Sequence, residues 1–137
     1  MSDRLVLQAL QTNLIDVVAN SSNPTLPVKM VGRTIPSADE WLEVLFIPNN
    51  MIGRYWGKEK VFKGIFRLVL HRLNVDAGAY SGMDLMEEFA IGFDKGTTLL
   101  NGSLPLKIVN NPEVTGVLEN GAEVLFPLSI RYQSFKP

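Results

Sequence analysis

The chain lacks cysteine entirely and has one histidine among its 137 residues. Without thiols there are no disulfides, no thiolate metal sites and no cysteine nucleophiles. A single imidazole cannot build a histidine-rich metal site, so we expect neither a metal nor another cofactor. A hydrolytic triad would have to use His71 as its base.

Charge of one sign and long apolar runs are also lacking. Thirteen basic residues against fourteen acidic ones give a net charge of −1, which argues against a dedicated nucleic-acid binder and leaves only a local basic strip. No uninterrupted run approaches the roughly 18–20 apolar residues of a membrane span. The first twenty residues also lack the apolar core of a signal peptide. We therefore expect no membrane contact and no specific nucleic-acid recognition.

The length fits one domain over residues 1–137, because domains commonly have about 100–200 residues. Its first predicted element is an amphipathic helix over 3–19, capped by Ser2 and ended before Pro24 and Pro27. A short strand is expected at 28–31. The apolar stripe of the helix comprises Leu7, Leu10, Leu14, Val17 and Val18.

Two longer strands are predicted next. The segment EWLEVLFI, residues 40–47, has the β-branched and aromatic content of a strand covered on both faces, and Pro48 ends it. The segment VFKGIFRLVLHRLNV, residues 61–75, alternates between two sets of side chains. One set is mainly apolar up to Arg72, and the other is semi-polar. The semi-polar set comprises Ile65, Arg67, Val69, His71 and Leu73.

A second helix and three short extended segments complete the pattern. Ser81 with Asp84 resembles a capping box, and Gly96 is the expected end of that helix. Residues 104–111, 113–121 and 122–133 are predicted to be extended, with a hairpin turn at 119–122. The predicted helical stripe comprises Met83, Met86, Ala90 and Phe93, and Pro127 predicts an edge position or a bulge in the last strand. This order predicts an α+β fold, a mostly antiparallel sheet with two helices packed on one face.

The candidates for catalysis are weak. His71 lies in mid-strand, where an exposed or hydrogen-bonded structural histidine is the favoured interpretation. The carboxylate pairs Asp39–Glu40 and Glu87–Glu88 are adjacent in sequence, and neighbours on a helix do not face one another. The glycine-rich segment 78–82 lacks the GK[ST] ending of a phosphate loop.

The most unusual segment is 51–63, where aromatic residues alternate with cations. Residues 48–60, which include most of this segment, lack either structural period and are predicted to form an extended loop or a long hairpin connection. Aromatic and cationic side chains suit a subunit or partner interface, a loop that folds back to cap the core, or a single-stranded nucleic-acid site. The interface residues predicted here are Met51, Ile52, Arg54, Tyr55, Trp56, Lys58 and Lys60.

Several segments together resemble the tail-terminator and tail-completion proteins of long-tailed bacteriophages. The resembling elements are the LxxALxTNLxD helix, LPVKMVGRTIPSADEWLEVLFIPN, the strand GIFRLVLH, the helix MDLMEEFAIGFDKGTTL and a closing strand ending in IRYQ. They cover most of the chain. The aromatic and cationic central loop departs from this pattern.

The resemblance implies a structural virion protein, not an enzyme, assembled in the host cytoplasm. It would form a ring, commonly hexameric, on the head-proximal end of the tail tube. The expected partners are further copies of the chain, the tail tube protein and the head connector or head-completion protein. A head-completion adaptor is the alternative, and a small hydrolase using His71 is a third hypothesis.

Overall fold

The computed structural model describes residues 3–49, 51–52, 60–73, 80–94, 98–101, 104–114 and 116–136. Two helices and nine strands lie within these ranges. The helices are α1 (Asp3–Ala19) and α2 (Tyr80–Gly92). The strands are β1 (Val28–Lys29), β2 (Glu40–Pro48), β3 (Met51–Ile52), β4 (Lys60–Leu73), β5 (Thr98–Asn101), β6 (Leu104–Ile108), β7 (Glu113–Val114), β8 (Leu118–Asn120) and β9 (Glu123–Lys136).

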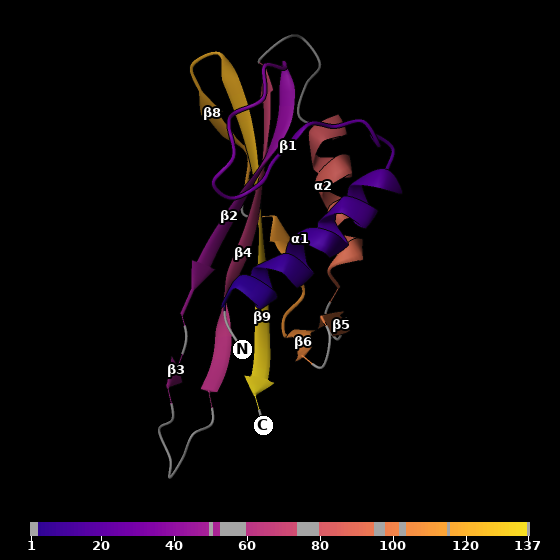
Figure 1. The fold of residues 1–137 in the computed structure, drawn as a ribbon. Helices are drawn as coiled ribbons and strands as arrows, with labels where there is room; N and C mark the ends of the chain where they lie inside the picture. The colour runs from indigo at the N-terminus through magenta and orange to yellow at the C-terminus, as the bar shows by residue number, and fades with distance from the viewer. Residues whose placement is uncertain are drawn as a thin grey trace.

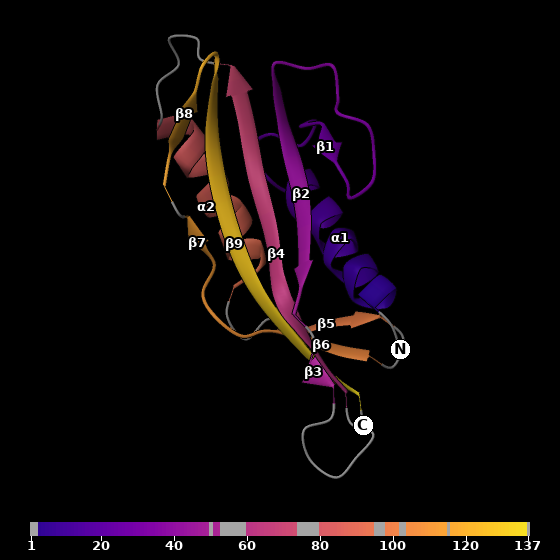
Figure 2. The ribbon, with the colours of Figure 1, turned by 90° about the vertical axis from the view of Figure 1, so that its left-hand side faces the viewer.

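The strands form one sheet with both helices on the same face (Figure 1). The strand order is β1-β2-β4-β9-β6-β5, while β3 pairs with β4, and β7 and β8 pair with β9. The β1–β2 pair is parallel and the other pairs of described strands are antiparallel. Figure 2 shows the long strands β2, β4 and β9 in front of the two helices. The predicted α+β fold is therefore confirmed.

The core lies between the helices and the inner face of β2, β4 and β9. The register places Leu42 beside Leu70 and Leu70 beside Phe126, and all three side chains are fully buried. Because opposed residues of an antiparallel pair share a face, the next rows of the same face are also apolar. They comprise Val44, Leu68 and Leu128, and then Phe46, Phe66 and Ile130. The apolar alternation predicted for residues 61–73 is thus confirmed.

Arg72 ends this apolar face, as its sequence position indicated. Its Nε donates to a Glu40 carboxylate oxygen at 2.7 Å, and its Nη1 donates to the Ser81 hydroxyl at 2.6 Å. Ser81 lies within the first turn of α2, which begins at Tyr80. The capping-box interpretation is therefore wrong, because an N-cap residue precedes the helix whereas Ser81 lies inside it.

Helix α1 has the predicted bounds, whereas α2 ends four residues earlier than expected. It stops at Gly92, whose carbonyl accepts a hydrogen bond from the Asn13 amide of α1 at 3.1 Å. The predicted stripe on α2 is wrong at Met83, which is 38% exposed. The buried residues of this helix are Gly82, Leu85, Met86 and Phe89, followed by Phe93 just after its end.

The last third holds more strands than the sequence predicted. Residues 98–101 form β5, although the family resemblance placed the first two in a helix. The predicted hairpin is present, but its two-residue turn is Gly121–Ala122, one position later than expected, because Asn120 pairs with Glu123. Gly121 has φ +62°, as two-residue hairpin turns require.

Pro127 lies neither on an outer edge strand nor in a bulge. The β4–β9 register runs unbroken through Val69 and Pro127. On the other side of β9, the β8 pairing ends at Leu125 and the β7 pairing begins at Leu128. On that side of β9 the Arg131 carbonyl accepts a hydrogen bond from the Val109 amide. Every second residue of a strand points its backbone groups to the same side, so the backbone nitrogen of Pro127 also points there. Pro127, which has no N–H to donate, thus lies between the β8 and β7 pairings, where no described residue pairs with β9 on that side.

Candidate interaction surfaces

The outer face of the sheet, opposite the helices, is the first candidate surface, and we call it the helix-free face. It carries alternate residues of three strands: Trp41, Glu43, Leu45 and Ile47 of β2; Lys63, Ile65, Arg67, Val69 and His71 of β4; and Glu123, Leu125, Pro127, Ser129, Arg131 and Gln133 of β9. This is the semi-polar face that alternation predicted.

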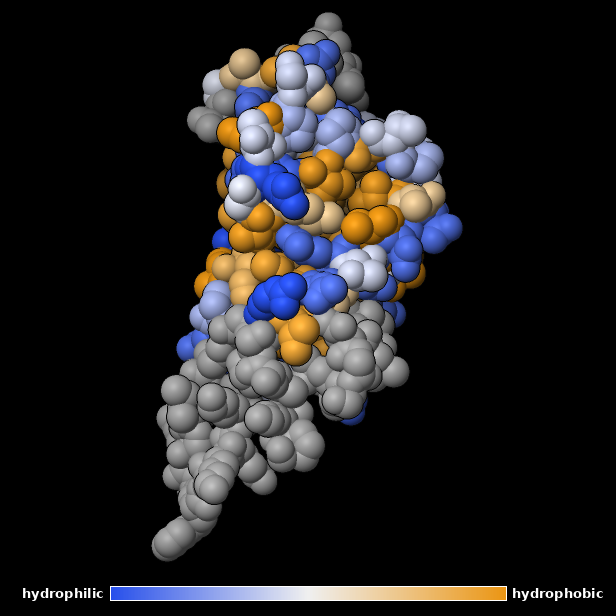
Figure 3. Space-filling view, in the orientation of Figure 1, coloured by the Kyte–Doolittle hydropathy of each residue, from blue (hydrophilic) through white to orange (hydrophobic). Residues whose placement is uncertain are grey.

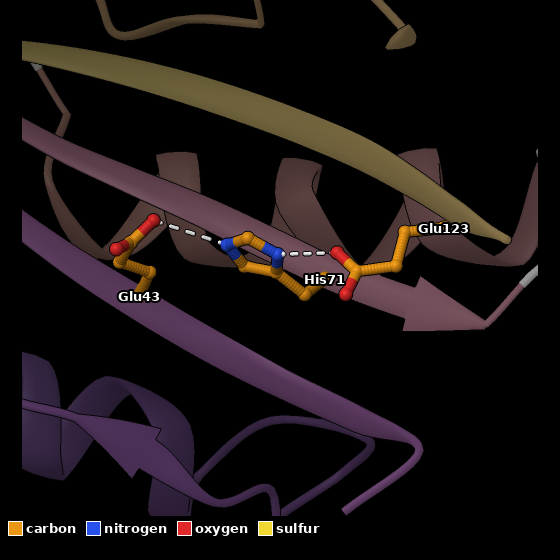
Figure 4. Close-up of polar contacts among 3 residues, drawn as sticks. All are labelled: Glu43, His71 and Glu123. Atoms are coloured by element: carbon orange, nitrogen blue, oxygen red, sulfur yellow. Dashed lines mark hydrogen bonds and ion pairs between the residues drawn. The ribbon is translucent and has the colours of Figure 1, made fainter. Parts of the chain in front are cut away.

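His71 is the centre of a polar cluster on this face (Figure 4). Its Nε2 lies 3.0 Å from a Glu43 carboxylate oxygen and its Nδ1 lies 2.9 Å from a Glu123 oxygen. The imidazole also stacks on Trp41, with ring centroids 3.9 Å apart and planes inclined by 4°. The cluster therefore joins β2, β4 and β9 across the sheet.

The geometry of His71 favours a structural role. Both ring nitrogens of His71 are occupied by a contact with a carboxylate oxygen, whichever of them carries a proton. Neither nitrogen is then left to take a proton from a hydroxyl, as a hydrolytic base must. The Glu43 and Glu123 side chains are 25% and 40% exposed, so solvent screens both ion pairs.

The other half of the helix-free face is cationic. Arg131 is exposed and Lys63 is half-buried, while the Arg67 guanidinium donates from Nε to the Ser129 hydroxyl at 3.2 Å. A hollow of about 590 Å³ lies here, lined by Lys63 and Arg131 together with the apolar side chains of Ile47 and Ile65. Ile47 is 44% exposed. The hollow thus combines positive charge with accessible apolar surface.

The outward side of α2 is the second candidate surface. Tyr80 is 84% exposed and Ile91 is 74% exposed, which is unusual for side chains of their size. The helix has no basic residue. Five residues at spacings of three or four lie along one side of this helix, and we call them the acidic stripe: Tyr80, Met83, Asp84, Glu87 and Ile91.

The α1 side of the molecule is different in charge. Ile15 of α1 is 58% exposed and lines the same surface groove as Arg4, while Asp16, the next residue along the helix, is also exposed. Figure 3 shows apolar patches separated by polar residues on this side. Its polar side chains thus include cations, whereas α2 has none.

The interface residues predicted from sequence are placed only in part. Met51 and Ile52 form β3 and pair with Val61 and Lys60 at the start of β4, which confirms a hairpin connection. The paired strands lie at one end of the molecule, beyond the helices (Figure 1). Four predicted residues lie outside the described ranges: Arg54, Tyr55, Trp56 and Lys58. The role of the hairpin therefore stays a prediction.

One carboxylate of each predicted pair, and the glycine-rich segment, have structural contacts. Glu40 pairs with Arg72, and Glu88 accepts from the Ser22 hydroxyl at 2.5 Å. Gly82 lies in α2 against the Phe126 ring, so it presents no phosphate-binding loop. Within the described ranges, no group of three or more histidine, aspartate or glutamate side chains is arranged so that it could hold a metal ion. Neither of the two described helices, α1 and α2, is long and apolar enough to span a bilayer.

Sequence reasoning missed the acidic stripe and the cationic hollow. From the sequence, the pair Glu87–Glu88 is considered as a candidate for catalysis, and Met83 is placed in the apolar stripe of the helix. Starting the helical period at Tyr80 would have placed Asp84, Glu87 and Ile91 on one side. The hollow depends on side chains from β2, β4 and β9, so no local sequence signal could have shown it.

Comparisons with known proteins identify one family. A family model described as phage tail terminator protein matches residues 5–132. One solved structure, labelled by a sequence code in place of a functional name, has a TM-score of 0.82 at 23% identity. The match covers 100% of this chain and 99% of the other, and it supports the fold alone. No curated protein matches the sequence.

Proposed function

The chain belongs to the phage tail terminator proteins, and from this membership we propose that it forms a ring, hexameric by analogy, on the head-proximal end of the tail tube. Family membership establishes a structural role in phage tail assembly, a place in the virion and contact with other virion proteins. The proposed ring would stop tube polymerisation and present the surface to which the head is joined. Its work is binding, and it catalyses no reaction.

The observation that carries the proposal is the family match over nearly the whole chain. Physical features of the molecule agree with it. Heterologous contacts between different patches can close into a ring when the rotation per subunit divides a full turn. The helix-free face and the outward side of α2 are two such patches, on opposite sides of the molecule (Figures 1 and 2).

We also propose that the hairpin around 51–63 contacts a neighbouring subunit or the tube end. Its apolar anchors would be Met51, Ile52, Tyr55 and Trp56, while Arg54, Lys58 and Lys60 would pair with acidic groups. The position of β3 at one end of the molecule supports this role, since a projecting element can reach a second protein.

Light scattering over a concentration series, with and without purified tail tubes, tests the ring. Negative-stain imaging of the mixture then locates the protein. We expect a closed ring, free or seated at one end of each tube. A chain that stays monomeric with tubes and binds filled heads instead would overturn the proposal and establish a head adaptor.

A further inference from the structure

We propose that the ring contact joins the acidic stripe of one copy to the cationic hollow of the next. This inference rests on the proposed ring and names the two faces that build it. The surfaces are those already defined: Tyr80, Met83, Asp84, Glu87 and Ile91 on α2, and Ile47, Lys63, Ile65 and Arg131 around the hollow.

The first argument is charge complementarity. Helix α2 carries three carboxylates and no cation, and the exposed Asp84 and Glu87 lie on its outward side. The hollow holds two cations, Lys63 and Arg131. Potentials of opposite sign steer association and disfavour incorrect partners. A second copy supplies the matching charge without any other protein.

The second argument is the apolar content of both surfaces. Ile91 and Tyr80 on the stripe are largely exposed, and the hollow presents Ile47 and Ile65 between its cations. Burying these groups against one another would supply a non-directional driving force that charge alone lacks. A central apolar anchor with charges around it is the usual anatomy of a protein interface.

The third argument is geometry. The stripe faces away from the sheet, and the hollow is on the sheet's opposite face, so one copy can use both surfaces at once (Figure 1). Each contact is heterologous, which is the type that builds rings. Helix α1 is a poorer match for the hollow, because its exposed charges are mixed, Arg4 and Asp16, whereas α2 carries carboxylates and no cation.

A charge exchange between copies tests the contact. Glu87→Lys and Arg131→Glu each place like charges across it, and each should raise the concentration for half-maximal ring assembly about tenfold or more. An equimolar mixture of the two variants should recover assembly. The introduced lysine of one variant meets the introduced glutamate of the other at one contact, and the native Glu87 meets the native Arg131 at the next. The mixture can satisfy every contact only in an even-numbered ring. The double variant E87K/R131E should also recover.

Matched controls and a folding check complete the experiment. Glu119→Lys and Arg33→Glu reverse exposed charges that belong to neither surface and should assemble like the unmodified chain. Thermal unfolding confirms that each variant is folded before assembly is compared. If the unmodified chain forms no ring with or without tubes, the proposed function fails. If it forms a ring that both single variants leave unchanged, or if folded variants lose assembly without recovery on mixing, only the named contact is overturned.

Discussion

The indole of Trp41 lies flat against the imidazole of His71, with ring centroids 3.9 Å apart, and the same imidazole contacts Glu43 and Glu123 through its two nitrogens. The chain's one histidine thus joins three strands on the helix-free face. This arrangement gives the semi-polar face a fixed side-chain geometry.

Replacing His71 with alanine should lower stability without removing function. The change removes the ring stack and leaves Glu43 and Glu123 without their shared hydrogen-bond partner, so we expect a loss of about 1–3 kcal/mol in the free energy of unfolding. Chemical denaturation measures this loss. Glu119→Ala, on the exposed hairpin strand β8, is the control and should change stability by less than about 0.5 kcal/mol.

Tube capping by His71→Ala should be normal wherever the variant is folded. A folded variant that lost a hydrolytic activity present in the unmodified chain would instead support the enzyme hypothesis. Unchanged stability would show that the cluster contributes nothing to the folded state.

Gly82→Ala should destabilise the protein even though alanine is the better helix former. A Cβ at this position would clash with Cζ of Phe126, and that ring is fully buried. The helix or the ring must therefore shift, at a cost of about 1–3 kcal/mol. Adding Phe126→Leu removes the clashing atoms, so the double variant should be less destabilised than the sum of the two single changes. Additive losses would contradict a direct clash.

Much of the sheet could be predicted because its rules are local. Alternation over residues 61–73 assigned Phe66 and Leu68 to the core and His71 to the other face, and the register confirms each position. A period of two is sufficient for this purpose, since it decides which face each side chain occupies. The partners of His71 were not predictable, because Glu43 and Glu123 are brought to it by strand pairing.

Helix α2 shows why the remainder was not predictable. Its end depends on Asn13, which is 79 residues away in the sequence and donates to the Gly92 carbonyl. Its buried side depends on how closely Gly82 approaches Phe126. Neither contact has a local signal, so Gly96 was taken as the end and Met83 as a core residue. The acidic stripe was missed for the same reason.

Asn13→Ala tests the contact between the helices. The Asn13 amide satisfies one of the carbonyls that every helix leaves unpaired at its end, and the bond is partly buried. Its removal should lower the free energy of unfolding by about 0.5–1.5 kcal/mol. Asn20→Ala is a matched control, because the side-chain amide of Asn20, just after the end of α1, donates to the Asp16 carbonyl at an exposed site. The control should lose less stability, and equal losses would show that burial of the Asn13 bond has no effect.

Replacing both Tyr55 and Trp56 with alanine tests the hairpin. These residues follow β3, whose pairing with β4 places the start of the hairpin at one end of the molecule. If both side chains are interface anchors, their truncation removes a large contact area. We therefore expect a rise of about tenfold or more in the protein concentration needed to cap tubes. Thermal unfolding should be unchanged, since an interface side chain does not stabilise the isolated chain. Lys58→Ala in the same hairpin should weaken capping less, because a rim lysine contributes little. A variant that unfolds well below the unmodified chain would show that the aromatic pair caps the core, and the hairpin would then lose its proposed role in assembly.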